Sequence, residues 1–209
     1  MAKGVRMLYR LKNTTMFLLM LCFVAGCFSY AEAVEISDEQ RDSRWAVPMQ
    51  LEGLPNLFQV TPNIYRSAQP DETGMRNAEK MGIKTVLSLR STNRDPDLSE
   101  GTGLKLVRVP IDTWNISYDE IVTALRIINN TPRPILVHCR HGADRTGLII
   151  AFYRMVFQGW SKDEATDELR NGGYGFHTIW RNIPRKIRDA DINDIKARVH
   201  AGMPPLRAE

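Results

Sequence analysis

Short apolar runs and amphipathic segments alternate along the chain from about residue 50. Runs rich in β-branched residues predict strands at 57–60, 64–66, 83–89, 104–110 and 134–137. Segments that begin after Asp71, Ser117 and Ser161 repeat their apolar residues at helical spacing, and each of these three side chains can cap a helix. This alternation, without internal repeats, predicts a single α/β domain with a central, mostly parallel sheet flanked by helices.

Three further segments complete the pattern of the domain. Residues 90–103 are polar and carry charges of both signs, which predicts a loop at the rim of the sheet. Residues 148–157 are apolar almost all round, as expected of a helix buried inside a domain. A basic amphipathic stretch over 177–198 closes the domain. We therefore assign residues 51–200 to the folded domain and 201–209 to a tail.

The N-terminal segment has a different pattern. Basic residues precede the apolar run 16–26, which is too short for a comfortable membrane span, so residues 1–26 are typical of an export signal peptide. The run ends in residues 24–27, which resemble the lipobox of bacterial lipoproteins. That resemblance implies that Cys27 is diacylated and becomes the new N-terminus, with a lipid anchor in the membrane.

The residues after Cys27 refine this prediction. Phe28 stands where an aspartate would resemble inner-membrane retention, so the outer membrane is favoured. Residues 27–50 are polar and mixed in charge, which predicts a tether between the anchor and the domain. The sequence thus predicts an exported, periplasmic, lipid-anchored protein. Ordinary signal cleavage near 30–33 and an uncleaved membrane anchor are the alternatives.

The charge balance argues against a nucleic-acid partner. The whole chain has 28 basic and 24 acidic residues and a pI of about 9.0. Four of the bases, Lys3, Arg6, Arg10 and Lys12, lie in the export signal, which contains no acidic residue. The remainder carries 24 bases against 24 acids and is formally neutral, so a partner bound through a net positive charge is not indicated.

The cysteines indicate one chemically available thiol. Of the three cysteines in the chain, Cys22 lies in the export signal and Cys27 is the lipidation candidate, which leaves Cys139. In an oxidising compartment Cys139 has no disulfide partner, and there is no Cys-x-x-Cys motif for thiol–disulfide exchange. A lone thiol is either a small buried hydrophobic group or a reactive one, and its position at the end of a strand favours reactivity.

A strand, a loop and a helix meet at Cys139. Five residues separate this cysteine from Arg145, which falls in the first turn of the buried helix. A short loop before a helix turns its N–H groups inward and so forms a cradle for an anion. The positive field of that cradle favours the thiolate, and the arginine can hold a phosphate through two parallel hydrogen bonds.

The sequence His138-Cys139, five residues, Arg145-Thr146-Gly147 resembles the active-site loop of the cysteine-based protein tyrosine phosphatase superfamily, in its atypical, bacterial dual-specificity branch. The resemblance covers roughly residues 54–188. It implies that Cys139 attacks phosphorus, that Arg145 and the loop amides hold the phosphate oxygens, and that Thr146 hydrogen-bonds the sulfur. It also implies chemistry without a metal or any other cofactor, and the four histidines are not spaced as a ligand cluster.

Cleavage of a phosphate ester also requires an acid for the departing oxygen. Asp112 ends the strand that precedes the catalytic one, and this stretch resembles the acid-bearing loop of the family. A lone aspartate after a strand is often only a turn cap, and that alternative stays open. Asp119 and Glu120 are the fallback acids, although both are expected on the surface of the next helix.

The remaining residues of the predicted phosphate-binding loop are Arg140, His141, Gly142, Ala143, Asp144 and Gly147. Arg140 and His141 would reach further phosphates of a substrate if they point inward. Asp144 resembles the Asp-Arg pair of myotubularin-type phosphoinositide phosphatases, and otherwise pairs with a neighbouring base. The motif 65–70 resembles an entry motif of atypical dual-specificity phosphatases, which implies a structural role, with Arg66 near the rim of the site at most.

The sequence therefore predicts a phosphomonoester hydrolase that works through a phosphocysteine on a phosphorylated protein or small molecule. An inositol-phosphate or phosphoinositide phosphatase is the alternative within enzymes, because of Arg140, His141 and Asp144. A phosphate-binding lipoprotein without catalysis is the alternative of another class. The presence of Cys139, Asp112 and Arg145 together argues against it, since a binding protein does not need all three.

Overall fold

Six strands form the central sheet of the computed structural model, which describes residues 41–201. The strands lie in the order β1-β2-β3-β6-β4-β5. Their bounds are β1 Val47–Pro48, β2 Phe58–Thr61, β3 Ile64–Ser67, β4 Thr85–Ser88, β5 Lys105–Arg108 and β6 Ile135–His138. The pairs β3-β6, β6-β4 and β4-β5 are parallel, and β1-β2 and β2-β3 are antiparallel. The predicted mostly parallel sheet is confirmed.

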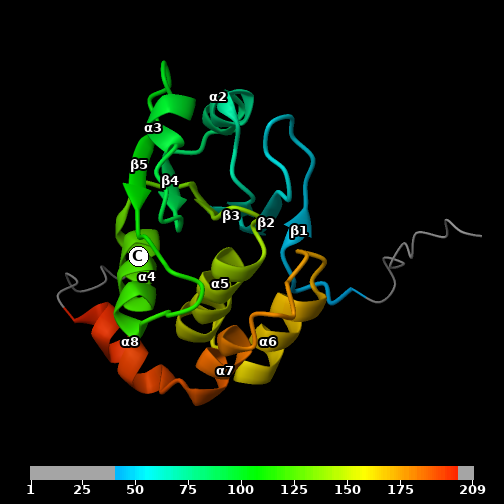
Figure 1. The fold of residues 1–209 in the computed structure, drawn as a ribbon, viewed down its shortest axis with the longest axis vertical. Helices are drawn as coiled ribbons and strands as arrows, with labels where there is room; N and C mark the ends of the chain where they lie inside the picture. Colours follow the sequence, from blue (N-terminus) through cyan, green and yellow to red (C-terminus); the bar gives the residue numbers. More distant parts are fainter. Residues whose placement is uncertain (1–40, 202–209) are drawn as a thin grey trace, which may run out of the picture. The chain divides into compact units, whose positions relative to one another are not determined.

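Helices cover both faces of the sheet (Figure 1). Helices α2 and α3 lie together near one end of the view, and α4 to α8 gather at the other (Figure 1). Their bounds are α2 Glu72–Lys80, α3 Asp95–Leu98, α4 Tyr118–Asn130, α5 Asp144–Phe157, α6 Lys162–Asn171, α7 Asn182–Asp189 and α8 Ile192–His200. None of the helices described within residues 41–201 is long and apolar enough to cross a membrane.

The alternation of side chains along the strands creates two hydrophobic cores. In β6, Ile135 and Val137 belong to the larger core with helices α4 to α8, whereas Leu136 belongs to the smaller core with α2. All three side chains are fully buried, as expected of a central parallel strand covered on both faces. Helix α5 packs against α4, α6, α7 and α8, which makes it the centre of the larger core.

The local signals for helix starts are confirmed. Asp71 accepts a hydrogen bond from the Gly74 N–H at 2.8 Å and caps α2. Ser117 and Ser161 each form a capping box with the glutamate three residues later, at the starts of α4 and α6. These signals are legible in the sequence because both partners of each bond lie within one turn.

Two boundaries differ from the prediction, and a further group of predictions falls outside the described residues. The tether expected over 27–50 ends earlier, because Ala46 is fully buried and β1 pairs with β2. The predicted C-terminal stretch over 177–198 is two helices, α7 and α8, separated at Ala190 and Asp191, where Asp191 caps α8. The predicted export signal, the lipidation candidate Cys27 and the tail after residue 201 lie outside the described residues.

The polar loop at 90–103 also differs from a simple rim loop. It contains the short helix α3, and the first residue of that helix, Asp95, is only 3% exposed. A buried carboxylate needs partners that offset its desolvation, and those partners lie at the end of β6.

Candidate active site

The loop of residues 139–143 joins the end of β6 to the start of α5. Cys139 is 2% exposed and packs within the larger hydrophobic core, at the end of the central strand of the sheet. It is the one free cysteine among residues 41–201. The predicted position of the thiol, at the carboxyl end of a buried parallel strand, is therefore confirmed.

The carbonyl groups of this loop are occupied by donors from other parts of the chain. Four consecutive carbonyls are involved. The Cys139 carbonyl lies 3.3 Å from His138 Nδ1, and the Arg140 carbonyl accepts from the Gln69 N–H at 3.2 Å. The His141 carbonyl accepts from Asn56 Nδ2 at 2.8 Å, and the Gly142 carbonyl accepts from Arg66 Nη2 at 2.7 Å. Three of these four donors come from residues 56–69, far away in the sequence. The contacts fix the direction in which the loop backbone faces.

The backbone N–H groups of the same loop, in contrast to its carbonyls, are free of hydrogen bonds to other described residues. Within residues 41–201, none of the backbone N–H groups of residues 140–146 donates a hydrogen bond to another residue. The first four N–H groups of a helix have no partner inside the helix, so α5 contributes to this row of free donors. A row of free N–H groups at a helix start, with their carbonyls tied back, is an anion-binding arrangement.

Two glycines allow this close packing. Gly142 has φ +71°, and a Cβ there would lie 2.6 Å from the backbone of Ser67 and Ala68. At Gly147, a Cβ would lie 2.4 Å from Leu169 Cδ1 on α6. Gly142 is therefore required by its backbone conformation and by its contact with the backbone of 67–68, whereas at Gly147 a larger side chain would displace Leu169 where α6 approaches α5.

One buried polar network, which we call the Glu168 network, supports the loop through Arg66. Arg66 is 1% exposed, donates to the Gly142 carbonyl, and lies 3.5 Å from the centre of the Tyr174 ring. The Tyr174 hydroxyl donates to Glu168 at 2.9 Å, and Arg154 donates to both carboxylate oxygens of Glu168 at 2.8 Å. Arg66 is thus a buried structural cation, which agrees with the structural role implied for this motif and places the side chain beneath the surface and not at the rim.

Arg66 also lies in the electrostatic environment of the thiol. Burial lowers the pKa of the Arg66 guanidinium, and its interactions with Tyr174, Glu168 and Cys139, in that order, oppose the shift. The guanidinium is therefore close enough to Cys139 for the two groups to interact.

A second buried network, which we call the Asp95 network, supports the end of β6. His138 Nε2 lies 2.9 Å from Asp95 Oδ2 and donates to it, since a carboxylate only accepts. Gln69 Nε2 donates to Asp95 Oδ1 at 2.9 Å, and Arg90 Nη1 donates to Gln69 Oε1 at 2.6 Å. Burial by itself would raise the pKa of Asp95, but His138 first and then Gln69 and Arg90 hold it below its usual value.

Arg145 connects the loop to the neighbouring strand ends. Its Nη1 donates to the carbonyls of Leu89 at 3.4 Å and Ile111 at 3.2 Å. The rest of the guanidinium forms no hydrogen bond with another residue of the range 41–201. The backbone carbonyls thus orient the arginine and leave its other N–H groups available to an anion.

Further cations lie around the entrance. Burial, followed by repulsion from Arg145, lowers the pKa of the Arg90 guanidinium, and Arg94 and Arg140 act in the same direction. Arg145, Arg94 and Arg140 are thus close enough to Arg90 for their charges to repel it. A concentration of positive charge of this kind attracts a phosphorylated ligand.

Asp112 lies directly after Ile111, whose carbonyl accepts from Arg145. Its side chain is exposed, and Asp112 Oδ1 accepts from the Trp114 N–H at 3.1 Å, so the residue also caps a turn. The fallback acids are farther along: Glu120 belongs to the capping box of α4, and Asp119 pairs with Arg198. Asp112 remains the candidate acid by its place next to the arginine contact.

Thr146 does not form the predicted hydrogen bond to sulfur. Its side chain is fully buried, and its Oγ1 has no hydrogen-bond partner among the described residues, Cys139 included. A buried hydroxyl without a partner is unusual in a folded protein, and such groups are frequent at catalytic positions. The residue is in the predicted place, in the first turn of α5, with its hydroxyl free.

Asp144 pairs with a base, which was the alternative to its resemblance to the myotubularin-type Asp-Arg pair. It is 6% exposed, and Asp144 Oδ1 accepts from the backbone N–H of His177 at 3.0 Å, while Oδ2 lies 2.9 Å from His177 Nδ1. The His141 ring lies 5.2 Å from the His177 ring, centre to centre. Burial lowers the pKa of His141, and His177 and Arg140 add to the shift. The expectation that the histidines do not cluster is therefore wrong for these two.

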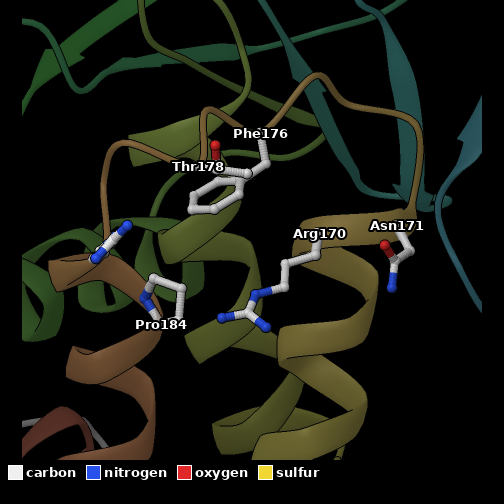
Figure 2. A pocket seen from close by; sticks show the side chains of 6 residues that line it. Arg170, Asn171, Phe176, Thr178 and Pro184 are labelled. Atoms are coloured by element: carbon white, nitrogen blue, oxygen red, sulfur yellow. The ribbon is translucent and has the colours of Figure 1, made fainter.

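A separate pocket of about 530 Å³ lies beside this segment. Figure 2 shows Arg170 extending from α6 toward Pro184 on α7, with Phe176 and Thr178 above them. Arg181 also lines the pocket. Because Phe176 and Thr178 flank His177, which contacts Asp144, the pocket adjoins the phosphate loop. None of its lining residues was predicted as a site residue.

Sequence reasoning missed Asp95 and Glu168 as supports of the loop. Arg66 belongs to the motif 65–70, so the sequence indicated that the residue is important, but it did not indicate that the side chain is buried. Asp95 and Glu168 look like surface acids because each stands in a polar stretch. No short motif marks them, since their partners lie 43 and 14 residues away.

Comparison with known proteins gives one consistent family. The sequence model of the tyrosine phosphatase family matches residues 54–174. The dual specificity protein phosphatase TpbA of Pseudomonas aeruginosa is 29% identical over 188 residues, covering 88% of this chain and 85% of its own. Inositol diphosphatase SIW14 of Saccharomyces cerevisiae is 31% identical over 125 residues, covering 55% of this chain and 44% of its own.

Solved structures agree with this fold. A crystal structure of P. aeruginosa TpbA, a Cys-to-Ser variant in complex with pTyr, has a TM-score of 0.71 at 29% identity, over 78% of this chain and 99% of that one. The catalytic domain of the S. cerevisiae PP-IP phosphatase SIW14, in complex with citrate, has a TM-score of 0.63 at 28% identity, over 73% of this chain and 94% of that one.

Proposed function

This chain belongs to the tyrosine phosphatase family, and on that premise we propose that it hydrolyses phosphate monoesters through a phosphocysteine formed on Cys139. The observation that carries the proposal is the loop itself. The N–H groups of residues 140–146 are free while four consecutive carbonyls are tied back. Such a loop binds an anion, and the thiol at its start supplies the nucleophile.

In the first step the Cys139 thiolate attacks phosphorus. The S–P bond forms as the bond from phosphorus to the ester oxygen breaks, and Asp112 gives its proton to the departing oxygen. The loop N–H groups and Arg145 hold the three remaining phosphate oxygens and stabilise the charge on them. In the second step water attacks phosphorus, Asp112 takes a proton from that water, and the S–P bond breaks to release phosphate and the thiolate.

Thr146 has its role in the second step. Its buried hydroxyl has no partner among the described residues and stands in the first turn of α5. As sulfur regains negative charge, the hydroxyl donates to it and makes it a better leaving group. The proposal thus gives a purpose to a buried polar atom that otherwise costs free energy.

The test is release of p-nitrophenol from p-nitrophenyl phosphate by the full chain. Cys139→Ser abolishes activity, because no phosphocysteine forms. Asp112→Asn lowers kcat by about 10²- to 10⁴-fold, the usual contribution of a general acid. Asp119→Asn, on the surface of α4, is the matched control and leaves kcat unchanged. Full activity in Cys139→Ser refutes the mechanism, and an inactive wild-type chain that still binds phosphate favours a non-catalytic phosphate-binding lipoprotein instead.

We propose phosphorylated protein as the first substrate class, and inositol phosphates as the second candidate. The second is supported by the arginines at the entrance and by the pocket beside His177, where the guanidinium groups of Arg170 and Arg181 have no ion pair within residues 41–201. SIW14, which is 31% identical over its matched region, is named an inositol diphosphatase.

The two substrate classes are separated by kcat/KM on a phosphotyrosine peptide and on an inositol polyphosphate. If the pocket takes further phosphates, Arg170→Gln and Arg181→Gln lower kcat/KM for the inositol polyphosphate and leave that for p-nitrophenyl phosphate unchanged. Arg76→Gln, an exposed arginine on α2, is the control. Equal rates on the inositol substrate in all three variants exclude the pocket from recognition.

For the N-terminal segment we propose export and a lipid anchor on Cys27. The support is the sequence alone: basic residues, a short apolar run and the lipobox-like residues 24–27. The chain would then act outside the cytoplasm, tethered to the bacterial outer membrane. Cys27→Ala is expected to abolish the mass increase of acylation and to release the protein from membranes. Unchanged membrane association in that variant contradicts the anchor.

A further inference from the structure

Three potential metal ligands meet beside the phosphate loop. One ligand atom from each of His141, Asp144 and His177 lies within 4.8 Å of the other two. His141 and Asp144 belong to the loop or its helix start, and His177 comes from the segment between α6 and α7. In the proposed phosphatase chemistry neither imidazole takes part in a bond-making or proton-transfer step.

The spacing suits one metal ion. With metal–ligand distances of about 2.0–2.2 Å, two ligands at a tetrahedral angle lie about 3.3–3.6 Å apart. His177 Nδ1 and Asp144 Oδ2 are 2.9 Å apart, and the third atom lies within 4.8 Å of both. His141 and His177 are both exposed, so their imidazole rings can turn toward a common centre with Asp144.

The cluster is also partly organised in advance. The His177 N–H donates to Asp144 Oδ1, which fixes the carboxylate and leaves Oδ2 directed to the imidazole. A ligand held by a second hydrogen bond loses less freedom when a metal binds. The Asp144 side chain is 8% exposed and that of His177 is 46% exposed, so an ion has a path from solvent to a carboxylate that is already oriented.

We propose that His141, Asp144 and His177 form a binding site for a divalent transition-metal ion of the zinc class. Two imidazoles and a carboxylate are ligands typical of Zn²⁺, whereas Mg²⁺ and Ca²⁺ require mainly oxygen ligands. Three protein ligands leave a fourth position for water or an anion. The site is separate from the phosphatase mechanism, and its existence does not depend on the proposed function.

A bound ion would add a link between two parts of the chain that already meet through the Asp144–His177 contact. His141 and Asp144 are in the phosphate loop, and His177 lies next to Phe176 and Thr178 of the arginine-lined pocket. The ion therefore joins the loop to the pocket segment. We expect it to stabilise that arrangement, so the midpoint of thermal unfolding rises with the metal concentration.

The test measures binding of Zn²⁺ to the tag-free full chain by isothermal titration calorimetry. All proteins carry Cys139→Ser, because the catalytic thiolate is itself a ligand for zinc. We expect one site whose affinity falls by at least about tenfold in His177→Ala and in His141→Ala, which is the effect of losing one of three ligands. His200→Ala, at the end of α8, is the matched control and binds with unchanged affinity.

Two further measurements make the outcome decisive. Mg²⁺ at the same concentrations does not bind this site, and the rise in the unfolding midpoint with Zn²⁺ disappears in His177→Ala. Circular dichroism shows whether each variant is folded before titration. Equal Zn²⁺ affinity in the three histidine variants, or binding of Mg²⁺ as tight as that of Zn²⁺, overturns the proposal. The Asp144–His177 contact is then only an ion pair that positions the loop.

Discussion

The Glu168 network and the Asp95 network support the same loop, but they differ in what they hold and in the charges they use. The Glu168 network holds the Gly142 carbonyl through Arg66 and also joins α5 to α6 through the Arg154–Glu168 pair. The Asp95 network ends at His138, the residue immediately before the nucleophile. In the first network the buried carboxylate pairs directly with a guanidinium, that of Arg154, whereas in the second Asp95 contacts the imidazole of His138, and the guanidinium of Arg90 acts only through Gln69.

Because of this difference, we expect the Glu168 network to contribute chiefly to the stability of the domain and the Asp95 network chiefly to the activity of the site. Glu168 accepts four hydrogen bonds, from Arg154 Nε and Nη2, the Ala46 N–H and the Tyr174 hydroxyl, and these donors come from three segments of the domain. Its loss would therefore loosen the whole core. Asp95 has two donors, His138 and Gln69, and both lie next to the loop. Its loss would chiefly displace the residues around Cys139.

The largest effect is expected for Glu168→Gln. The substitution leaves Arg154 as a buried cation without its counter-charge, and removal of one partner of a buried pair costs about 3–5 kcal/mol. We expect that loss in the free energy of unfolding, measured by urea denaturation. Glu164→Gln on the same helix is the control: its partner Arg44 is exposed and the glutamine preserves the capping box, so stability barely changes. Equal stability of the two variants would show that the Glu168 network is not the stronger support.

A smaller loss of stability, with a distinct loss of activity, is expected for Asp95→Asn. Loss of the charged acceptor of His138 costs about 1.5–3 kcal/mol of stability. Because His138 adjoins Cys139, we also expect kcat to fall about tenfold, or about 1.4 kcal/mol in activation free energy. Asp97→Asn, exposed two residues later in α3, is the matched control. If the loss of kcat is in the same proportion to the loss of stability in Asp95→Asn and in Glu168→Gln, the two networks do not differ in their contributions to activity and to stability.

The smallest effect is the pH dependence of stability. Burial would raise the pKa of Asp95 and of Glu168, but His138 and Arg154 respectively hold each pKa below its ordinary value. A carboxyl with a lowered pKa in the folded state stabilises the protein above its unfolded pKa, and this contribution is lost as the pH falls below about 4. Urea denaturation between about pH 7 and pH 3 should therefore show the gap between wild type and Asp95→Asn narrowing in acid. A constant gap would contradict the ionised state of Asp95.

Much of the fold could be predicted because its signals are local. The strand of 135–138 is recognisable from its apolar run, and Ser117 and Ser161 identify helix starts through partners three residues away. Residues 177–198 were predicted only as a basic amphipathic stretch, and its division into two helices was missed because no glycine or proline marks the break at Ala190. The short helix at Asp95 was missed because its burial depends on His138, 43 residues away.

The sequence by itself determined the chemistry of the site: a thiol, an arginine six residues later, a hydroxyl residue and two glycines, all within one strand–loop–helix unit. These residues act through a backbone whose shape the unit sets locally, so their spacing is informative. Only the tertiary structure decided which charges are buried and what neutralises them. Arg66 reaches Gly142 across 76 residues, and Asp144 meets His177 across 33. Burial of a charge is stable only with such partners, and distant segments bring them together only when the whole domain folds.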